Sequence, residues 1–596
     1  MKNHRIIQLL LLILLTPGLS NCAKAKQAPT SNPTVAPPIV DFDTFVDQSY
    51  KALLARDPEI VLTLGMADYL GTPKDQLTNI SDSYIHETQQ LQVETLAQLN
   101  TFDRDSLTPM QQRTFDTYAW YLKDQVDGQK FMYDNYPVTP TVNGINFSLQ
   151  YFLTDYAPLQ SEKDAENYMQ LLAEVPTKIQ QLNDALKIRA EKGVILPRFL
   201  FNWVTPSIQS ITLSTPSNNI YYKNFETKLS AIPGLTDTRR QELLNQAKNE
   251  IAQSVQLAYA SLVDTLNGLS RTAGNTIGSW SLPNGENYYG YTLQHHTTTN
   301  MSAEEIYSLG IQELTSIRSR MDILFASLGY PSGLTLSEYY KRVASDGGYV
   351  SGSAIQAEYE KIINNAETSI ANLFNKQPNI GVIVRGDPMG GFYMPPSMDG
   401  SRPGIFYAQT QGSIPRYGMA DLAYHEAVPG HHLQLALPGE MNLPLFQKLI
   451  ELNGYTEGWA LYAERLMWEN GAYSNDPYGE LGYLQMQARR AARLVIDTGI
   501  HSKKWTFDKA VTFMIENTGM TEYDVQGEVG RSIVWPGQEC SYYVGYLKIL
   551  ELRQRMQKAL GDKFDIKAFH DLVLGGGPVP LAVLEQEVND YLAVSQ

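Results

Sequence analysis

Cysteine is nearly absent from this chain of 596 residues, which contains only Cys22 and Cys540. Two cysteines at opposite ends of a chain exclude a disulfide-stapled fold, so a hydrophobic core must hold the structure together. Basic residues are also scarce, because 47 lysines and arginines stand against 63 acidic residues and leave a formal net charge of -16. Such a chain has no electrostatic attraction for phosphate backbones, and we expect no nucleic-acid partner.

Long apolar runs are equally rare, and the informative one lies at the N-terminus. Lys2 and Arg5 precede the apolar stretch 6–15, which is too short to span a bilayer and suits the h-region of a secretory signal. The stretch leads into Leu-Ser-Asn-Cys, ending at Cys22, which resembles the lipobox at which bacterial lipoproteins are cleaved and lipidated. An ordinary signal peptide with an incidental cysteine is the alternative, because Asn21 replaces the small residue usual before that cysteine.

The segment after Cys22 is rich in proline, alanine and polar residues and has no hydrophobic period, as in a flexible tether. We therefore predict a signal peptide over residues 1–21, a lipidated tether over 22–40 and a single helical catalytic body over 41–596. The predicted location is the bacterial cell envelope, at the outer membrane or facing the periplasm. The lipid anchor is the only contact with a membrane that we expect.

Apolar residues recur at helical spacing through most of this body, in segments such as 165–192, 238–268 and 303–328. Residues 381–410 differ, because β-branched and aromatic runs alternate there with glycine and proline clusters. The segment 417–428 that follows has helical spacing again. These patterns predict a mainly α fold, in which a large helical body has a deep cleft and a small β element next to the histidine-bearing helix 417–428.

Three of the nine histidines crowd into eight residues, as His425, His431 and His432. In the zinc-protease helix His-Glu-x-x-His, two histidines one turn apart share a metal ion. Here Pro429 occupies the position of the second histidine, so an unbroken helix would not bring a second histidine to the same metal ion as His425. Because proline lacks the N–H donor and its ring clashes with the preceding turn, we expect a bulge that loops out two residues. His431 then becomes the second ligand, with His432 as the alternative.

A third ligand is expected on a neighbouring helix, since catalytic zinc has three protein ligands and one position open for water. Glu457 and Glu464 follow shortly downstream, and Glu457 is the choice because Gly458 and Trp459 beside it indicate a close-packed site. One zinc ion per chain is therefore predicted. The competing interpretations are a polar helix end in which the histidines cap carbonyl groups, and a surface position for Glu457.

Four motifs carry a resemblance to a known family: HEAVPGHHLQ, TEGWALYAE, RLVIDTGIH and PGQECSYYVG. Together they resemble the bacterial family called domain of unknown function 885, many members of which are described as lipoproteins, over nearly the whole chain after residue 41. That family is similar to the helical zinc peptidases of the thimet oligopeptidase and neurolysin type, whose helix reads His-Glu-x-Gly-His and whose third ligand is a downstream glutamate. The resemblance implies His431 and Glu457 as ligands, and this chain departs from the peptidase pattern by two inserted residues.

Peptide hydrolysis by zinc needs a base for the attacking water and donors for the oxyanion. Glu426, next to the first histidine and about 100° around the helix from it, is placed to be the base. Tyr542 is a candidate phenolic donor, with core packing as the alternative. The family motif makes His501 a candidate for oxyanion stabilisation or substrate binding, whereas most single histidines are structural.

Substrate contacts are expected from two arginines and one strand. Arg402 and Arg493 can clamp a substrate carboxylate through paired hydrogen bonds, or they can be buried ion-pair partners. The run from Ile405 to Tyr407 is a candidate edge strand to which an extended peptide adds, or it belongs to the sheet core. Three histidines have no group of acidic residues near them in the sequence and are assigned structural roles: His295, His296 and His570.

The sequence therefore favours an envelope-anchored zinc metallopeptidase that hydrolyses short peptides, because a deep helical cleft excludes folded proteins. Two alternatives stay open. One is another metal-dependent hydrolase, such as an amidase, or a non-haem iron oxygenase with two histidines and one carboxylate, although an oxygenase leaves Glu426 without a task. The other is a lipoprotein that kept the fold, lost catalysis and only binds peptides. The sequence does not indicate an oligomeric state.

Replacing Cys22 by serine is expected to abolish lipidation, because the thiol that accepts the lipid is lost. The protein then moves from the membrane fraction to the soluble fraction, and the N-terminal peptide loses the mass of the lipid. Fractionation and mass spectrometry measure both effects, with Cys540→Ser as the matched control that keeps the anchor. Unchanged fractionation of Cys22→Ser would show that the anchor lies elsewhere.

Overall fold

The computed structural model describes residues 40–387, 390–398, 400 and 402–595. The predicted signal peptide 1–21 and Cys22, with nearly all of the tether, lie outside these residues. The described chain is mainly α-helical, as the sequence predicts. None of the helices in the described ranges combines the length and the apolar character that a membrane span requires.

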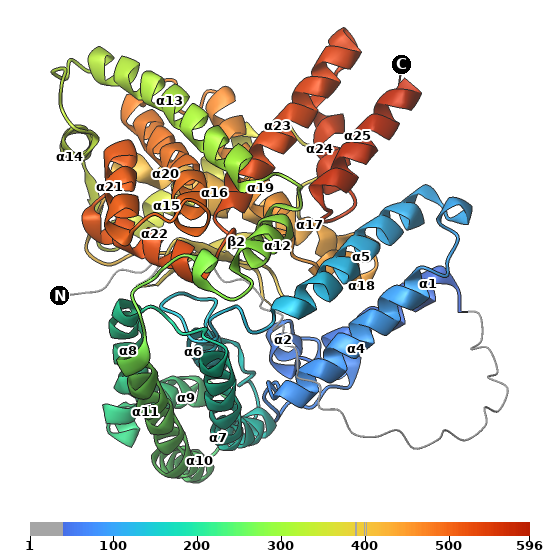
Figure 1. Cartoon of the computed structure of the whole chain (residues 1–596), viewed down its shortest axis with the longest axis vertical. Coiled ribbons are helices and arrows are strands. Elements are labelled where there is room, and N and C mark those ends of the chain that lie inside the picture. The colour runs from blue at the N-terminus through green and yellow to red at the C-terminus, as the bar shows by residue number, and fades with distance from the viewer. Residues whose placement is uncertain (1–39, 388–389, 399, 401, 596) are drawn as a thin grey trace.

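The first helices form two groups beside and below a larger body (Figure 1). The blue group on the right contains α1 (Phe42–Leu54), α2 (Pro58–Thr63), α3 (Ala67–Leu70), α4 (Asp82–Leu99) and α5 (Pro109–Gly128). The teal and green group at the bottom contains α6 (Ile145–Tyr151), α7 (Glu162–Glu191), α8 (Arg198–Leu213), α9 (Ile220–Ser230), α10 (Asp237–Glu250) and α11 (Gln256–Thr272).

The larger body is built from the remaining helices. Its first members are α12 (Gly285–Thr297), α13 (Ala303–Ser327), α14 (Leu336–Gly347), α15 (Ala354–Ser369), α16 (Met419–Glu426), α17 (His431–Glu440) and α18 (Leu445–Leu449). The chain continues through α19 (Asn453–Glu469), α20 (Pro477–His501), α21 (Phe507–Thr518), α22 (Glu522–Val534), α23 (Cys540–Leu560), α24 (Ile566–Leu574) and α25 (Leu581–Ser595).

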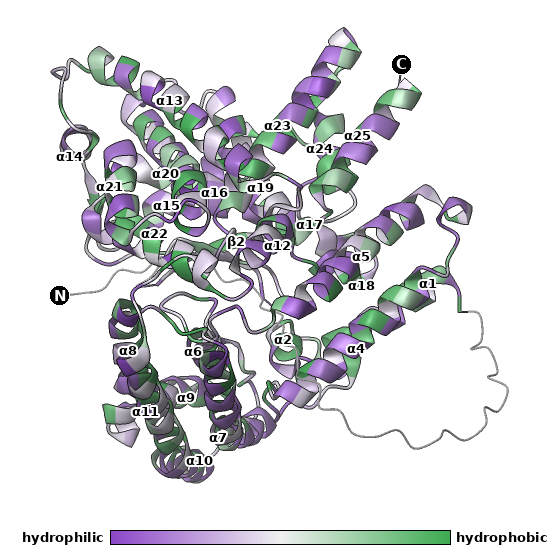
Figure 2. Ribbon diagram, viewed as in Figure 1, coloured by the Kyte–Doolittle hydropathy of each residue, from purple (hydrophilic) through white to green (hydrophobic). Residues whose placement is uncertain are grey.

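Side-chain caps fix where several of the predicted helices begin. At α13 the hydroxyl of Ser302 accepts the N–H of Glu305, whose carboxylate accepts the N–H of Ser302 in return. Thr335 and Glu338 form the same reciprocal pair at α14. Such capping boxes satisfy backbone donors that a helix start would otherwise leave unpaired. Along outer helices such as α13, hydrophilic and hydrophobic residues alternate as expected for one buried face (Figure 2).

The predicted β element is present between α15 and α16. In one sheet, β4 (Gly404–Ala408) lies between β2 (Val382–Gly386), to which it is parallel, and β3 (Phe392–Met394), to which it is antiparallel. A second pair joins β1 (Tyr349–Ser351) to β5 (Ser413–Pro415). The prediction that Ile405 to Tyr407 forms an edge strand is wrong, because β4 is hydrogen-bonded on both sides and leaves no free edge for a peptide.

Two helix pairs form the centre of the larger body. The nearly fully buried α20 packs against α13, and α19 packs against α23. Glycines allow the second pair to approach closely: a Cβ on Gly458 would lie 2.5 Å from the carbonyl carbon of Gly545, and a Cβ on Gly545 would lie 1.8 Å from the oxygen of Gly454. This crossing fixes the position of Glu457, the residue before Gly458.

Gly545→Ala is expected to destabilise the fold by about 1–3 kcal/mol, the usual cost of forcing extra carbon into a packed core. The matched control is Gly527→Ala on α22, where the position is exposed and a Cβ would meet no atom within 4 Å. Alanine there should be neutral or stabilise the helix by up to about 1 kcal/mol. Denaturant unfolding measures both, and a Gly545→Ala protein as stable as wild type would contradict the close crossing.

Candidate metal centre

Three predicted ligands lie together where α16, α17 and α19 meet. His425 is near the end of α16, His431 begins α17, and Glu457 lies in the second turn of α19. The Nε2 atoms of both histidines are 3.5 Å from Oε2 of Glu457. One ligand atom from each residue lies within 4.8 Å of the others, and all three side chains are buried.

The donor set fits a metal ion better than it fits hydrogen bonding. A separation of 3.5 Å is long for a hydrogen bond between Glu457 and either histidine. It is close to the roughly 3.4 Å that separates two ligands about 2.1 Å from one tetrahedral zinc ion. In addition, Nε2 of His425 and Oε2 of Glu457 are buried without a hydrogen-bond partner in the described chain. Buried polar atoms are normally satisfied, so this cluster has the character of a metal site.

A full helix break, instead of the predicted bulge, brings the two histidines together. The α16 helix ends at Glu426 and α17 starts at His431. Within the break, a Cβ on Gly430 would lie 1.9 Å from the carbonyl oxygen of His425, so only glycine fits. Trp459 of α19 donates its indole N–H to the carbonyl of Pro429 at 3.0 Å. The break turns His431 back toward His425, with ring centroids 4.8 Å apart.

The alternative ligand, His432, lies outside the cluster. Its Nδ1 is 2.8 Å from the hydroxyl of Tyr393 on β3, and burial lowers the pKa of His432 to about 4. Of the two candidates for the second ligand, the structure therefore brings only His431 to His425 and Glu457.

Glu464 completes the support of the centre, a role that the sequence interpretation missed. Its Oε1 is 2.7 Å from Nδ1 of His425, and both side chains are fully buried. Gln487 donates to the other oxygen of Glu464 at 3.0 Å. A carboxylate on Nδ1 fixes the ring so that Nε2 presents its lone pair to a metal. The spacing in the sequence could have indicated this role, because Glu464 lies seven residues, about two helical turns, after Glu457 and therefore on the same face of the helix.

Glu426, the predicted base, borders the same cluster. It is buried, and its Oε2 has no hydrogen-bond partner within the described ranges. Burial is the main cause that raises the pKa of Glu426 to about 8, while His431 opposes the rise and Glu457 adds to it. Burial also raises the pKa of Glu457, but its interactions with the two histidines outweigh burial and hold that pKa far below the usual range. The two neighbouring carboxylates therefore differ in proton affinity.

Tyr542 of α23 stands beside the first histidine. Its ring is nearly parallel to that of His425, at an interplanar angle of 11° and a centroid distance of 6.4 Å. Arg531 donates to its hydroxyl at 3.2 Å. Burial, followed by the charge of Glu457, raises the pKa of Tyr542 to about 12, so the phenol keeps its proton at neutral pH. It is thus a hydrogen-bond donor at the edge of the cluster.

The substrate-clamp prediction for Arg493 is wrong. Its Nε lies 2.7 Å from Oε2 of Glu528 and 3.0 Å from Oε1 of Glu539, with all three side chains buried. The guanidinium also lies 4.9 Å from the ring centre of Tyr542. The ion-pair alternative therefore holds, and Arg493 helps to position Tyr542.

The catalytic role predicted for His501 does not fit either. Nδ1 accepts the backbone N–H of Ser279 at 3.0 Å, and Nε2 lies 2.8 Å from the carbonyl oxygen of Ser532. Burial lowers the pKa of His501 to about 4. With both ring nitrogens bonded to backbone, His501 ties the end of α20 to its neighbours and has no atom left for a substrate.

Arg402 differs from Arg493, because it has no carboxylate partner among the described residues. Burial lowers the pKa of Arg402, and Tyr407 and Tyr156 are the first of its neighbours to oppose that shift. Its Nη1 is buried and lacks a hydrogen-bond partner in the ranges that the structure covers. Tyr407, the other predicted substrate contact here, has its ring stacked on that of Phe392 with centroids 4.5 Å apart, as expected of a residue in the core of the sheet. Arg402 is the candidate that stays compatible with a substrate carboxylate.

Known proteins resemble this chain in sequence and structure. The structure of a candidate lipoprotein from Colwellia psychrerythraea aligns over 93% of this chain and 99% of its own length, at 27% sequence identity and a TM-score of 0.88. A candidate lipoprotein of unknown function from Shewanella oneidensis covers 92% of this chain with 99% of its own, at 19% identity and a TM-score of 0.70, and shows the shared fold alone.

A carboxypeptidase of Pyrococcus furiosus aligns over 93% of this chain and 99% of its own length. Its sequence identity of 9% and its TM-score of 0.33 are too low to carry an argument. No curated protein matches the chain. The family described as bacterial protein of unknown function, DUF885, matches residues 61–588, so the chain belongs to that family, as its four motifs predict.

Proposed function

We propose that this protein is a zinc-dependent metallopeptidase that hydrolyses short peptides. The observation that carries the proposal is the buried cluster of His425, His431 and Glu457, with Glu426 directly beside it. Two imidazoles and one carboxylate are a common ligand set of catalytic zinc. When bound, zinc supplies Lewis acidity that polarises a carbonyl group and lowers the pKa of water.

The residues around the ligands have complementary tasks. Glu426 would take the proton of the attacking water and give it back to the leaving amine. Burial raises its pKa to about 8, and the positive charge of bound zinc would oppose that rise and favour the ionised form that a base needs. Tyr542 keeps its proton and donates a hydrogen bond to the charge that develops on the carbonyl oxygen. Glu464 holds the ring of His425 in one orientation.

Short peptides are the proposed substrates because the candidate ligands are buried and because Arg402 has no carboxylate partner among the described residues. Buried ligands favour a substrate with little bulk around the bond that is cut, as in a short flexible chain. Arg402 offers a guanidinium for a carboxylate, which a peptide C-terminus or an acidic residue provides. The N-terminal lipobox pattern, together with the candidate lipoproteins among the structural neighbours, supports a position in the cell envelope.

The purified protein is expected to bind about one zinc ion per chain, and His431→Ala should lose it because one of three ligands is removed. His432→Gln is the matched control and should keep the metal, since His432 pairs with Tyr393. Glu464→Gln should weaken zinc affinity about 10- to 100-fold, the usual effect of losing an outer-shell partner. Elemental analysis and competition with chelators measure these values. Full zinc retention by His431→Ala would rule out the assigned ligand set.

Glu426→Gln is expected to keep the metal and lose peptidase activity by about 10²–10⁴-fold, because the amide cannot accept the proton. Glu516→Gln, an exposed change on α21, is the control and should leave the activity unchanged. Mass spectrometry of digests of mixed short peptides scores internal and terminal cuts. If folded, zinc-replete wild type leaves every peptide intact, the peptidase proposal fails and a binding protein or another metal-dependent enzyme takes its place.

A further inference from the structure

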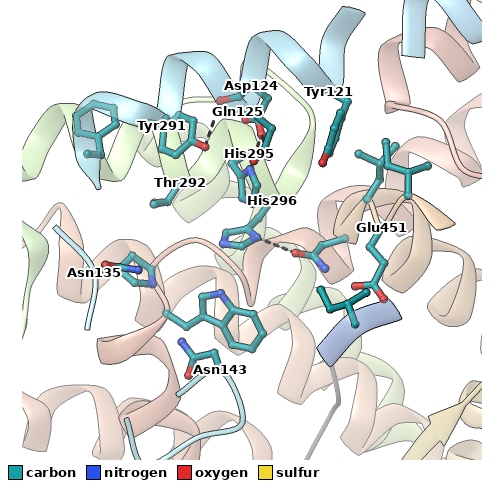
Figure 3. A pocket seen from close by; sticks show the side chains of 18 of the residues that line it. Tyr121, Asp124, Gln125, Asn135, Asn143, Tyr291, Thr292, His295, His296 and Glu451 are labelled. Atoms are coloured by element: carbon teal, nitrogen blue, oxygen red, sulfur yellow. Dashed lines mark hydrogen bonds and ion pairs between the residues drawn. The ribbon is translucent and has the colours of Figure 1, made fainter. Parts of the chain in front are cut away.

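A second site lies outside the ligand cluster, in a cavity of about 250 Å³. One wall comes from α5 and another from α12, and further lining comes from α1, α2 and residues within 131–145, 449–453 and 534–536. Figure 3 shows polar side chains from these segments gathered around the space, among them Asp124, Gln125 and His295. The cavity therefore joins the N-terminal helices to the larger body.

A pair of a half-buried histidine and a buried aspartate lines this cavity. Nδ1 of His295 lies 2.7 Å from Oδ2 of Asp124, whose side chain is 7% exposed. Gln125 donates its Nε2 to the same oxygen at 3.3 Å. The sequence interpretation placed His295 outside any acidic constellation and took it as structural, because Asp124 is 171 positions away. Both contacts use Oδ2, which leaves Oδ1 as the oxygen that a ligand can approach.

The other acceptors of the cavity also favour a ligand with N–H groups. Gln125 is 4% exposed, and its Oε1 has no hydrogen-bond partner in the described part of the chain. Such an orphaned buried acceptor is costly unless a donor reaches it. Asp124 and Glu451 contribute carboxylates to the lining. Burial lowers the pKa of His295, but its contact with Asp124 outweighs burial and raises it, so His295 offsets one carboxylate, and the described lining contains no lysine or arginine. The balance of charge therefore favours a positive guest.

Aromatic rings complete the surroundings. Tyr121, Tyr291 and Trp535 all line the cavity, and the ring of Trp535 already has the guanidinium of Arg531 5.4 Å from its centre. A cation over the face of such a ring gains electrostatic energy, and the gain is larger when water is excluded. A guanidinium or an ammonium group matches this combination of carboxylate, amide oxygen and ring faces better than a neutral side chain does.

Two sets of contacts connect lining residues of the cavity to the candidate metal centre. Nδ1 of His296 lies 2.7 Å from Oδ1 of Asn453, the first residue of α19. Glu457 follows one turn later, about 6 Å along the helix axis. On the other wall, Arg531 lies 5.4 Å from the ring of Trp535 and donates to the hydroxyl of Tyr542.

We propose that this cavity is a specificity site that binds a cationic group of the peptide, an ammonium or a guanidinium, next to the bond that is cut. The proposal rests on the proposed peptidase function for its role in catalysis, but the binding of a cation can be measured without it. Two sources supply the same chemistry, a basic side chain and the free N-terminal amine, and peptides that contain only one of them separate the two.

The first test measures binding without turnover. The probe is arginine amide, added to the Glu426→Gln protein and followed by calorimetry, with N-acetylnorleucine amide, which carries no charge, as the neutral probe of similar length. Asp124→Asn and Gln125→Leu are each expected to weaken the binding of arginine amide about 10- to 100-fold, the range for a hydrogen bond to a charged group. Asp127→Asn, an exposed change on the same helix, is the matched control and should bind as the parent does. Circular dichroism checks the folding of each variant, and Gln125→Leu keeps the test decisive if Asp124→Asn fails to fold.

The second test compares turnover of three peptides by wild type: one N-acetylated with a single arginine, one with a free N-terminus and no basic residue, and one N-acetylated and neutral. A kcat/KM at least about tenfold higher for the first or second peptide assigns the site to a side chain or to the terminal amine. The proposal is overturned if the neutral peptide is cut equally well, or if N-acetylnorleucine amide binds as tightly as arginine amide. Selective binding of arginine amide with no cleavage of any peptide would keep the cation site and remove the peptidase function.

Discussion

The break between α16 and α17 is the constraint on which the candidate metal centre depends. On a continuous helix, His425 and His431 would lie about 9 Å apart along the axis, too far to share one ion. The break works because Gly430 lets the chain pass over the carbonyl of His425, and because the indole of Trp459 holds the carbonyl of Pro429. Trp459 lies two residues after Glu457, so one helix supplies both the third ligand and the support that aligns the first two.

Buried ionisable side chains surround this break. Burying such groups costs folding free energy, which indicates that they serve a function other than stability. Asp421, one turn before His425, is fully buried, and burial followed by the charge of Glu464 raises its pKa well above the usual range. On the opposite side, Glu528 pairs with Arg489 and Arg493 in a buried network next to Tyr542. Replacing such networks by apolar residues is often neutral or stabilising, so stability alone does not account for them. Their contacts instead lead to the ligand His425 and to the donor Tyr542.

The sequence predicted the features that depend on local order and could not predict those that depend on distant partners. The ligand cluster follows from residue type and spacing, since His425, His431 and Glu457 lie within 33 positions. In contrast, the interpretation of Arg493 needed Glu528 and Glu539, and that of His501 needed the backbone of Ser279, 222 positions away. The strand 404–408 was recognised as β structure, but its place in the middle of the sheet depends on a parallel pairing with β2 that no local pattern encodes.

The N-terminal helices and the larger body contribute different side chains to the cavity and to the candidate metal centre. None of the predicted metal ligands lies in α1 to α11, yet α5 contributes Asp124 and Gln125 to the cavity that borders α19. The cavity and the ligand cluster are thus connected through α19, which contributes Asn453 to the first and Glu457 to the second, and through Arg531, which contacts both Trp535 and Tyr542. If the cavity is the specificity site that we propose, changes in α5 would alter which peptide is accepted while the candidate metal ligands on α16, α17 and α19 keep their geometry. Specificity and metal binding would then depend on separate parts of one sequence.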